Sequence, residues 1–528
     1  MTAILQSPFG TFQGKQSDGI TQYLGIKYAS VKDQLSPPEL VTDYGDVVVD
    51  ATHFGPRAPA IDGCSFEQEH LIQCNTNAQE ETPNMSGTEC LNLNITVPKM
   101  ELGDRKIPVM VFIHGGGLIM GANYWPQYDP SLLVKMSGEM DMPAIAVNIN
   151  YRLGILGNLA SQELHDAGYM GNNSLRDQKC ALQWIKRHIA AFGGDEENVT
   201  VFGESAGASS VLYQLHSKEP LFKRCISMSG TPLMLRPLPL PVAETSYASI
   251  VQTFGLENAS TSERIERLRT ASPEDLVANT PLSVPLLPVL DGDILSDATT
   301  FAKLASHDHA NLPGMQWCES LMIGDCQHDG IVFFFMGLSQ RKDGIATALT
   351  TSLHENLATS ATQSVLEAYN ITASTEDTDA LKRIMELATD IAYVAPALAY
   401  ARSFPGKSYY YQFNEPNPWD GTFRGHSTHM LDAAFLFQHF NHELSPEALE
   451  VATTLAQDFV RFANGAEPWS EFEEKMGMVR KYGPGKIGIV GNNGWGSGRR
   501  DVLWKLSEEG KVDLDDLIGA WHMFIAGK

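Results

Sequence analysis

The sequence predicts an α/β fold in which buried strands alternate with helices. Residues 107–113 and 199–202 are short apolar runs, which are typical of strands that are buried inside a sheet. Between them, apolar residues recur at helical spacing over 175–192, which predicts an amphipathic helix packed on that sheet. Alternation of this kind is the pattern of the α/β class.

The second of these strands leads into a candidate nucleophile. Ser205 stands at the centre of Gly203-Glu204-Ser205-Ala206-Gly207, and a helix is expected to begin directly after it. A sharp turn from strand to helix forces tight backbone torsions, so the residues flanking the serine must be small. The motif G-x-S-x-G is common by chance, but its place between a strand and a helix favours a catalytic serine.

The strand at 107–113 leads into the glycine run His114-Gly115-Gly116-Gly117. Glycines leave backbone N–H groups uncovered, so such a loop can donate hydrogen bonds to the oxyanion of a tetrahedral intermediate. We expect Gly116, Gly117 and Ala206 to be the donors. Taken alone, the run reads more simply as a turn that needs positive φ angles, and only the pairing with Ser205 favours the oxyanion hole.

Several blocks resemble the type-B carboxylesterase/lipase family, which includes cholinesterases and fungal lipases. The longest runs over 171–211, and the others are HGGGLIMG at 114–121, NYRLGILGNL at 150–159, ECLNLNI at 89–95, PVLDGDIL at 288–295 and GHSTHMLDAAFLF at 425–437. The resemblance spans most of the chain and is closest to fungal members. It implies the α/β-hydrolase fold, with a large central, mostly parallel sheet flanked by helices and with helical insertions that form the pocket.

A serine hydroxyl needs a base, and the base needs an acid to fix its tautomer. In this fold the chain order is serine, acid, histidine. The acid is expected after the strand 320–324, where Asp325 and Asp329 compete. Asp329 is favoured because it immediately precedes Gly330, the position at which the family usually carries a glutamate.

Two histidines in one late segment compete for the role of base. The family pattern has the histidine three residues before an acid, which His429 satisfies with Asp432. His426 would place another histidine where that acid belongs. The expected catalytic set is therefore Ser205, Asp329 and His429.

The catalytic motifs extend from 114 to 429 and must converge on one site, so one domain over 1–528 is expected, with insertions at about 231–290 and 331–420. The pattern further predicts an opening hairpin over 10–28 and strands at 91–97, 143–150 and 225–229. Helices are expected within 243–280, 345–402 and 445–465.

The resemblance also implies structural contacts. Arg152 and Asp177 match one ion pair of the family. Both partners of a second family ion pair are absent from this chain, and Thr88 stands at one of the two positions. Cys64 and Cys90 occupy positions that resemble the family's first disulfide loop. The count of seven cysteines leaves at least one thiol free.

The net charge of −25 opposes binding to nucleic acid or to anionic membranes. No apolar run is long enough to span a bilayer, and the chain does not open with a signal pattern, so a cytoplasmic protein is expected, with a mature secreted form as the alternative. The cluster His307-Asp308-His309 is too small to predict a metal site, and no cofactor is expected. The oligomeric state is left open.

These features predict a serine hydrolase that cleaves small-molecule carboxylic esters through an acyl-enzyme. Two alternatives stay open: an acyltransferase or cyclising, product-releasing enzyme of a biosynthetic pathway with the same triad, and a cholinesterase-like binding module without catalysis. The apolar insertions favour an acyl chain or an aromatic ester as substrate.

Overall fold

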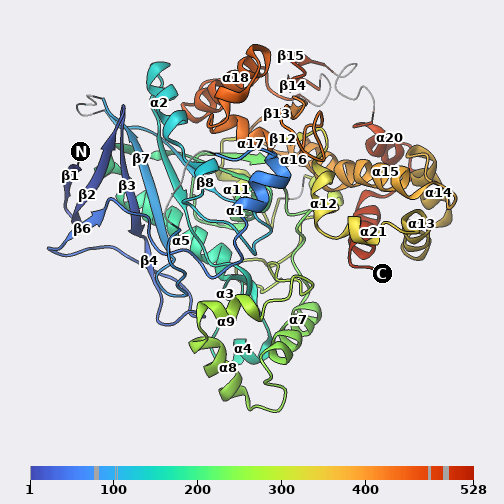
Figure 1. Ribbon diagram of the computed structural model, residues 1–528, viewed down its shortest axis with the longest axis horizontal. Coiled ribbons are helices and arrows are strands. Elements are labelled where there is room, and N and C mark those ends of the chain that lie inside the picture. Colours follow the sequence, from blue (N-terminus) through green and yellow to red (C-terminus); the bar gives the residue numbers. More distant parts are fainter. Residues whose placement is uncertain are drawn as a thin grey trace.

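A computed structural model describes residues 2–76, 82–100, 103, 105–307, 309–473, 477–491 and 499–528. Its centre is one twisted sheet that crosses the upper body of the molecule, with the N-terminal strands at one edge and the C-terminal strands at the other (Figure 1). Within the described residues it has 13 strands, in the order β1-β2-β3-β7-β9-β8-β10-β11-β12-β13-β14-β15, and β6 pairs with β2. A two-stranded ladder, β4-β5, lies outside it.

The sheet is parallel in the middle and antiparallel at its edges. Every pair from β9 through β8, β10, β11, β12 and β13 to β14 is parallel. The strands are β1 Thr2–Ser7, β2 Gly10–Ser17, β3 Ile20–Lys27, β4 Ala29–Ser30, β5 Glu39–Leu40, β6 Val48–Ala51, β7 Asn92–Pro98, β8 Ile107–Ile113, β9 Ile145–Ile149, β10 Gly194–Glu204, β11 Arg224–Met228, β12 Ser320–Cys326, β13 Lys407–Phe413, β14 Val479–Tyr482 and β15 Ile487–Val490.

The central strands are buried because helices cover both faces of the sheet. Every residue of β8, β9 and β11 is buried. Successive side chains of a strand point to opposite faces, so Val111 of β8 joins one core while Phe112 joins the other. The core with Val111 is closed by α5 Asn173–His188, α6 Ala206–Tyr213 and α16 Ala395–Ser403. The core with Phe112 is closed by α2 Ser131–Glu139, α17 Leu431–Leu436 and α18 Pro446–Ala463.

Two helical regions extend from this body (Figure 1). The lower lobe holds α3, α4 and α7–α9, and the right-hand end of the molecule in this view holds α13–α15, α20 and α21. The remaining helices are α1 Cys64–Phe66, α3 Gly154–Asn158, α4 Gln162–Asp166, α7 Leu240–Thr253, α8 Thr261–Thr270, α9 Pro273–Ala278, α10 Phe301–Ala305, α11 Gly314–Trp317, α12 Val332–Phe335, α13 Ile345–Asn356, α14 Thr359–Ala368, α15 Asp377–Thr389, α20 Val502–Glu508 and α21 Leu514–Ile525.

One helical stretch is long and apolar enough to cross a membrane by length and composition. It runs over Asp377–Ser403 and comprises α15, the π-helical turn η7 Asp390–Val394 and α16. Of its most apolar window, 89% is buried inside the fold. This stretch packs as a core helix beside the sheet.

The predicted elements are found with small shifts at their ends. The helix expected over 175–192 is α5, and a 3₁₀ turn continues it to Phe192. The helices expected within 243–280, 345–402 and 445–465 are present, as are the predicted strands. Residues 407–413, inside the second predicted insertion, form β13 of the central sheet.

The cysteines do not form the disulfide that the resemblance to the family suggested. All seven are free thiols, Cys64 and Cys90 included. Cys64 Sγ lies 3.4 Å from Gln127 Oε1, whereas Cys90 is fully buried in the core beside the sheet. The resemblance to the family's first disulfide loop therefore does not extend to a bond.

Candidate active site

Ser205 lies at the turn between β10 and α6, where its backbone adopts φ 56° and ψ −121°. A positive φ is unusual for a residue with a side chain and costs about 1–3 kcal/mol, which the surrounding structure must offset. The turn is held on both sides, because the Ser205 amide donates to Met228 O at 2.9 Å and its carbonyl accepts from Ser209 at 3.0 Å. Ser205 is partly exposed, while Glu204 and Ala206 beside it are buried.

The neighbouring glycines are required by close backbone contacts. A Cβ at Gly203 would lie 2.5 Å from the carbonyl carbon of Gly207, and a Cβ at Gly207 would lie 2.0 Å from Ile113 O. Neither contact can be relieved by moving a flexible side chain. The expectation of small residues around Ser205 is confirmed at Gly203 and Gly207, whereas Glu204, directly before the serine, is large.

His429 and Asp329, 100 residues apart in sequence, are hydrogen-bonded. His429 Nδ1 lies 2.7 Å from Asp329 Oδ1, and both side chains are almost completely buried. Asp329 opens the 3₁₀ turn after β12, and His429 precedes α17. The two loops also meet through a bridge between His328 and Thr428. An aspartate thus reaches the imidazole here, although its side chain is one methylene shorter than the usual glutamate of the family.

The second oxygen of the Asp329 carboxylate is held by two donors. Ser229 Oγ donates to Oδ2 at 3.0 Å, and the Cys326 amide donates to the same atom at 2.8 Å. These bonds fix the plane of the carboxylate and therefore the direction in which Oδ1 faces His429. Ser229 itself has a positive φ of 49°, just beyond the end of β11.

A second carboxyl group faces the other nitrogen of the imidazole. Glu204 Oε1 lies 3.2 Å from His429 Nε2, and Glu204 is fully buried without a hydrogen bond from any described residue. Burial raises the pKa of Glu204 well above its usual range, and the nearby charges of Asp432, Glu67 and Asp329 raise it further. Both effects favour the neutral form of this carboxyl group over its carboxylate.

The glycine loop approaches the serine from β8. A Cβ at Gly115 would lie 3.2 Å from Ser205 Cβ, so this loop and the turn at Ser205 are in contact. Gly116 and Gly117 have positive φ angles of 91° and 62°. Within the described part of the chain, the amides of Gly116, Gly117 and Ala206 donate to no protein acceptor. They are therefore free to donate to a ligand.

His114 anchors the start of this loop. Its ring stacks on Tyr151 with 4.4 Å between the centroids, and Tyr151 Oη donates to His114 O at 2.7 Å. Burial lowers the pKa of His114 to about 4, so the imidazole is neutral. The loop is thus fixed by packing and neutral hydrogen bonds, without a charge of its own.

The two rival residues lie elsewhere. Asp325 is on β12, where it pairs with Arg500 at 2.7 Å and accepts a hydrogen bond from Tyr410. His426 Nδ1 faces Arg424 O at 3.3 Å, and its ring contacts His328. The structure therefore brings Asp329, and not Asp325, to His429.

Sequence reasoning missed two side chains of this site. Ser229 could have been found, because it directly follows the strand next to the one that leads to Asp329. The other is Tyr393, whose ring lies 5.3 Å from that of His429. It comes from the helical stretch η7, and nothing in its local sequence indicates the contact.

The ion pair expected from the resemblance is present and completely buried. Arg152 Nη2 lies 2.7 Å from Asp177 Oδ1, and Arg152 also donates to the carbonyls of Gln34 and Ser36. The pair ties α5 to the N-terminal segment. Among the described residues, no group of three or more His, Cys, Asp or Glu side chains could hold a metal ion, and Asp308 of the His307–His309 cluster lies outside them.

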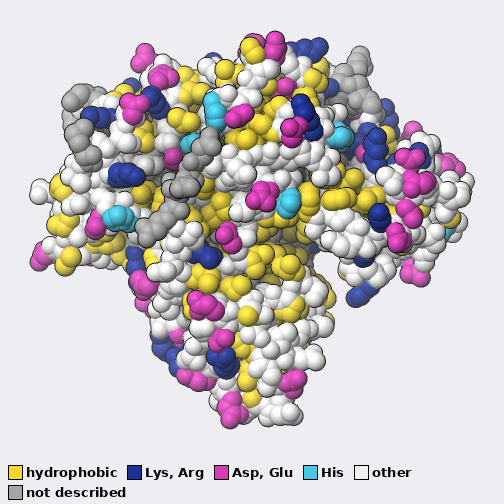
Figure 2. All heavy atoms as spheres, in the orientation of Figure 1, with side chains coloured by type: hydrophobic (Ala, Val, Ile, Leu, Met, Phe, Trp, Pro, Cys, Tyr) yellow, Lys and Arg dark blue, Asp and Glu magenta, His cyan; other side chains and the backbone are white. Residues whose placement is uncertain are grey.

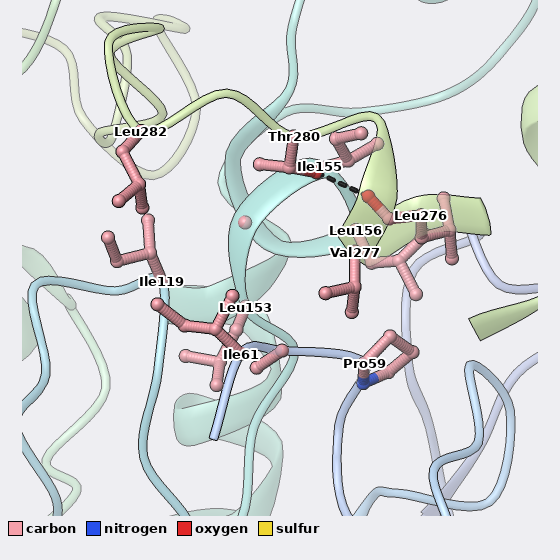
Figure 3. A pocket seen from close by; sticks show the side chains of 12 residues that line it. Pro59, Ile61, Ile119, Leu153, Ile155, Leu156, Leu276, Val277, Thr280 and Leu282 are labelled. Carbon is pink, nitrogen blue, oxygen red and sulfur yellow. Dashed lines mark hydrogen bonds between the residues drawn. The ribbon is translucent and has the colours of Figure 1, made fainter. Parts of the chain in front are cut away.

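An apolar pocket lies close to the glycine loop, and Figure 3 shows its walls. Ile119, two residues after Gly117, contributes to one side, and residues of α3 and α9 face it. The amide of Gly154, at the start of α3, donates to Leu118 O at 2.8 Å, which fixes this wall to the glycine loop. The lining residues are Pro59, Ala60, Ile61, Ile119, Leu153, Gly154, Ile155, Leu156, Leu276, Val277, Thr280 and Leu282.

Comparison with known proteins agrees with this arrangement. The family model described as the carboxylesterase family matches residues 1–483. The chain belongs to the carboxylesterase family. It is 27% identical to Lipase 3 of Yarrowia lipolytica over 486 residues, with 89% of each chain covered. It is 28% identical to the para-nitrobenzyl esterase of Bacillus subtilis over 499 residues, which are 89% of this chain and 91% of that protein.

A solved structure of a PNB esterase superposes on this carboxylesterase with a TM-score of 0.73 and 26% identity, and 94% and 99% of the two chains are covered. The α/β-hydrolase fold predicted from the motifs is confirmed. Membership of the family also confirms the predicted activity, which is hydrolysis of carboxylic esters by a serine hydrolase. This activity fits the relatives better than acyl transfer or a non-catalytic binding role.

Proposed function

We propose that Ser205, His429 and Asp329 are the catalytic triad of this esterase. The single observation that carries the assignment is the buried hydrogen bond between His429 Nδ1 and Asp329 Oδ1. It fixes the tautomer in which Nδ1 carries the proton and Nε2 is free to accept one. His429 Nε2 has no hydrogen bond to Ser205 in this structure, but it lies 3.2 Å from Oε1 of Glu204, the residue directly before the serine. A histidine held in this way can activate the hydroxyl of a serine beside it.

The reaction then runs in two halves. Ser205 Oγ attacks the ester carbonyl while His429 Nε2 takes its proton, and the same proton passes to the leaving alcohol as the acyl-enzyme forms. Water attacks this intermediate with His429 again as base, and the acid leaves. The amides of Gly116, Gly117 and Ala206 hold the oxyanion in both halves, and the N-terminus of α6 adds a favourable dipole.

The triad is tested by Ser205→Ala in a para-nitrophenyl butyrate assay. We expect the turnover number to fall by about 10⁴-fold or more, because the nucleophile and its base act as a unit. Ser209→Ala is a matched control, since Ser209 lies one helical turn later, is buried and bonds to Thr231 O. A fluorophosphonate probe should label the wild type and Ser209→Ala, but not Ser205→Ala. Labelling of Ser205→Ala at the wild-type rate would refute the assignment.

We further propose that the apolar pocket near Ile119, which encloses about 20 Å³ in this structure, widens to receive the hydrophobic part of the substrate. All its lining residues except Thr280 and Gly154 are apolar, which suits an acyl chain or an aromatic group and disfavours a charged one. Hydrophobic side chains also gather on the surface between the main body and the lobe of α7–α9 (Figure 2). Leu282, at the edge of the pocket, is 72% exposed.

A series of para-nitrophenyl esters of increasing chain length tests this proposal. Val277→Trp fills the pocket, so we expect it to lower kcat/KM for long acyl chains at least about tenfold while acetate is little affected. Val242→Trp, on the partly exposed helix α7, is the control and should leave the chain-length profile unchanged. An unchanged profile in Val277→Trp would place the substrate elsewhere.

We propose a reducing compartment such as the cytoplasm for the protein. Support comes from the seven free thiols, because disulfides persist mainly in oxidising compartments. The test is to isolate the protein without reductant, unfold it, and titrate its thiols before and after reduction. Seven thiols without reductant agree with the proposal, and fewer contradict it.

A further inference from the structure

A second cavity lies behind the loop that carries Asp329, and its walls are polar. Its volume is about 570 Å³, within the range of small-molecule sites. Gln327 and His328, which directly precede Asp329, form one side. The other lining residues are Ala368, Tyr369, Asn370, Arg383, Glu386, Gln412, Asn414, Lys481, Arg499, Arg500 and Val502.

Four basic side chains converge on this cavity from three parts of the chain. Arg383 comes from α15, Lys481 from β14, and Arg499 and Arg500 from the segment before α20. Glu386 is the one acidic side chain among the lining residues. Burial and nearby cations lower the pKa of His328 to about 3, so its imidazole is neutral. The chain as a whole carries a net charge of −25, which makes this local excess of cations unusual.

Internal ion pairs account for part of this positive charge. Arg499 pairs with the buried Asp390, and Arg500 Nη2 lies 2.7 Å from the buried Asp325 Oδ1. Arg383 donates to a backbone carbonyl, that of Asn370. The two buried aspartates and Glu386 thus offset part of the charge of the four basic side chains.

The environment of the Arg500 side chain is the strongest indication that this cavity binds a ligand. Its side chain is only 7% exposed, and its Nε and Nη1 donate to no acceptor among the described residues. A buried guanidinium with unmet N–H groups is costly, and such groups normally find an acceptor. An oxyanion in the cavity would supply acceptors that the protein itself does not.

We propose that this cavity binds a small molecule carrying an oxyanion of at least two negative charges, either a phosphate or a polycarboxylate. Arginines suit this chemistry because the planar guanidinium donates two parallel hydrogen bonds to a carboxylate or phosphate. The site is distinct from the apolar pocket, with which it shares no lining residue.

The site is connected to the proposed catalytic loops. Arg499 Nη2 donates to Gln327 O at 2.8 Å, and the His328 amide donates to Ser427 O at 2.9 Å. An anion held by Arg499 and Arg500 therefore adds contacts to the segment that positions Asp329 and, through it, to the segment of His429. Binding stabilises the folded state by mass action.

Calorimetry and thermal unfolding of the full chain, with pyrophosphate and citrate as probes at matched ionic strength, test the proposal. We expect saturable binding of at least one probe and a matching rise in unfolding temperature. Arg383→Gln/Lys481→Gln should weaken that binding about tenfold or more, since two charge-assisted contacts are lost while the buried pairs are kept. Lys15→Gln, at an exposed position of β2, should leave it unchanged.

The relative affinity of the two probes identifies the class of ligand, because tighter pyrophosphate binding indicates a phosphate and tighter citrate binding a polycarboxylate. Two results would overturn the proposal. One is the absence of saturable binding of either probe up to millimolar concentration. The other is equal weakening in Lys15→Gln and in the double variant, which would show a nonspecific effect of net charge.

Discussion

His429 Nε2 lies 3.2 Å from Oε1 of Glu204, the residue that immediately precedes Ser205. The imidazole thus has a carboxyl group near each nitrogen. The two carboxyls differ in environment, since Asp329 accepts hydrogen bonds from Ser229 and the Cys326 amide, whereas Glu204 receives none from the described residues. The same turn that carries Ser205 therefore places a buried carboxyl group beside His429.

Glu204→Gln should change how stability depends on pH. Because the pKa of Glu204 is raised in the folded state, the folded protein binds more protons than the unfolded chain above the usual pKa of about 4.5. Stability contributed by this group is then lost as pH rises from that value toward the folded pKa. We expect Glu204→Gln to lose less stability than wild type between about pH 5 and pH 8, measured by thermal unfolding. Glu450→Gln, at an exposed position on α18, is the control, and equal slopes in all three proteins would contradict the prediction.

Ser229→Ala should slow catalysis without removing any residue of the proposed triad. The variant loses the hydrogen bond to Asp329 Oδ2, and a bond to a charged group contributes about 1.5–3 kcal/mol. We expect kcat/KM to fall roughly tenfold to a hundredfold, with a shift in its pH profile, because the carboxylate that orients His429 is less well held.

Ser137→Ala provides the comparison for Ser229→Ala. Ser137 is a buried hydroxyl on α2 that donates to Val134 O and accepts from the Ala144 amide. Its loss should reduce stability and leave kcat/KM and the pH profile unchanged. If the two variants have the same kinetics, Ser229 has only a structural role.

The glycine loop offers a graded test of the oxyanion hole. At Gly116 an added Cβ would lie 2.3 Å from Met120 O, so the loop backbone must move, and Gly116→Ala should lower kcat about a hundredfold or more. At Gly117 the nearest atom is 3.7 Å away, and the main cost is about 1–2 kcal/mol for a left-handed alanine. Gly117→Ala should therefore fold less stably but lose much less activity. The reverse order of the two rates, measured with one ester, would contradict the assignment of the loop.

Breaking the Arg152–Asp177 pair should destabilise the fold. Arg152→Met leaves a buried carboxylate without its partner, which costs about 3–5 kcal/mol of unfolding free energy. The double variant Arg152→Met/Asp177→Leu removes both charges and should recover part of this loss. Urea unfolding measures the unfolding free energy of both variants. A double variant that is less stable than Arg152→Met would show that the remaining contacts of Asp177 matter more than its charge.

Local sequence predicted the candidate nucleophile and the glycine loop. Ser205 could be assigned because strand, turn and helix follow one another within a few residues, and the contacts of Gly203 and Gly207 are local consequences of that turn. The periodicity of α5 and the apolar run of β8 were equally readable, since each follows from the burial of a single element.

Only the tertiary structure decided the partners of His429. The residues are far apart in sequence, and the roles of Asp329 and Asp325 depend on which face of β12 and which loop each one occupies. Asp325 is directed toward Arg500 and Tyr410, whereas Asp329 lies beyond the strand end, where the loop of His429 passes.

The raised pKa of Glu204 could likewise not be predicted from the sequence, because it follows from burial and from the charges of Asp432, Glu67 and Asp329, which lie in other segments. The sequence by itself was therefore sufficient to predict the groups whose role depends on residues within one turn of the chain. The fold decided those whose chemistry arises from neighbours, because distance and dielectric environment exist only after the segments have packed.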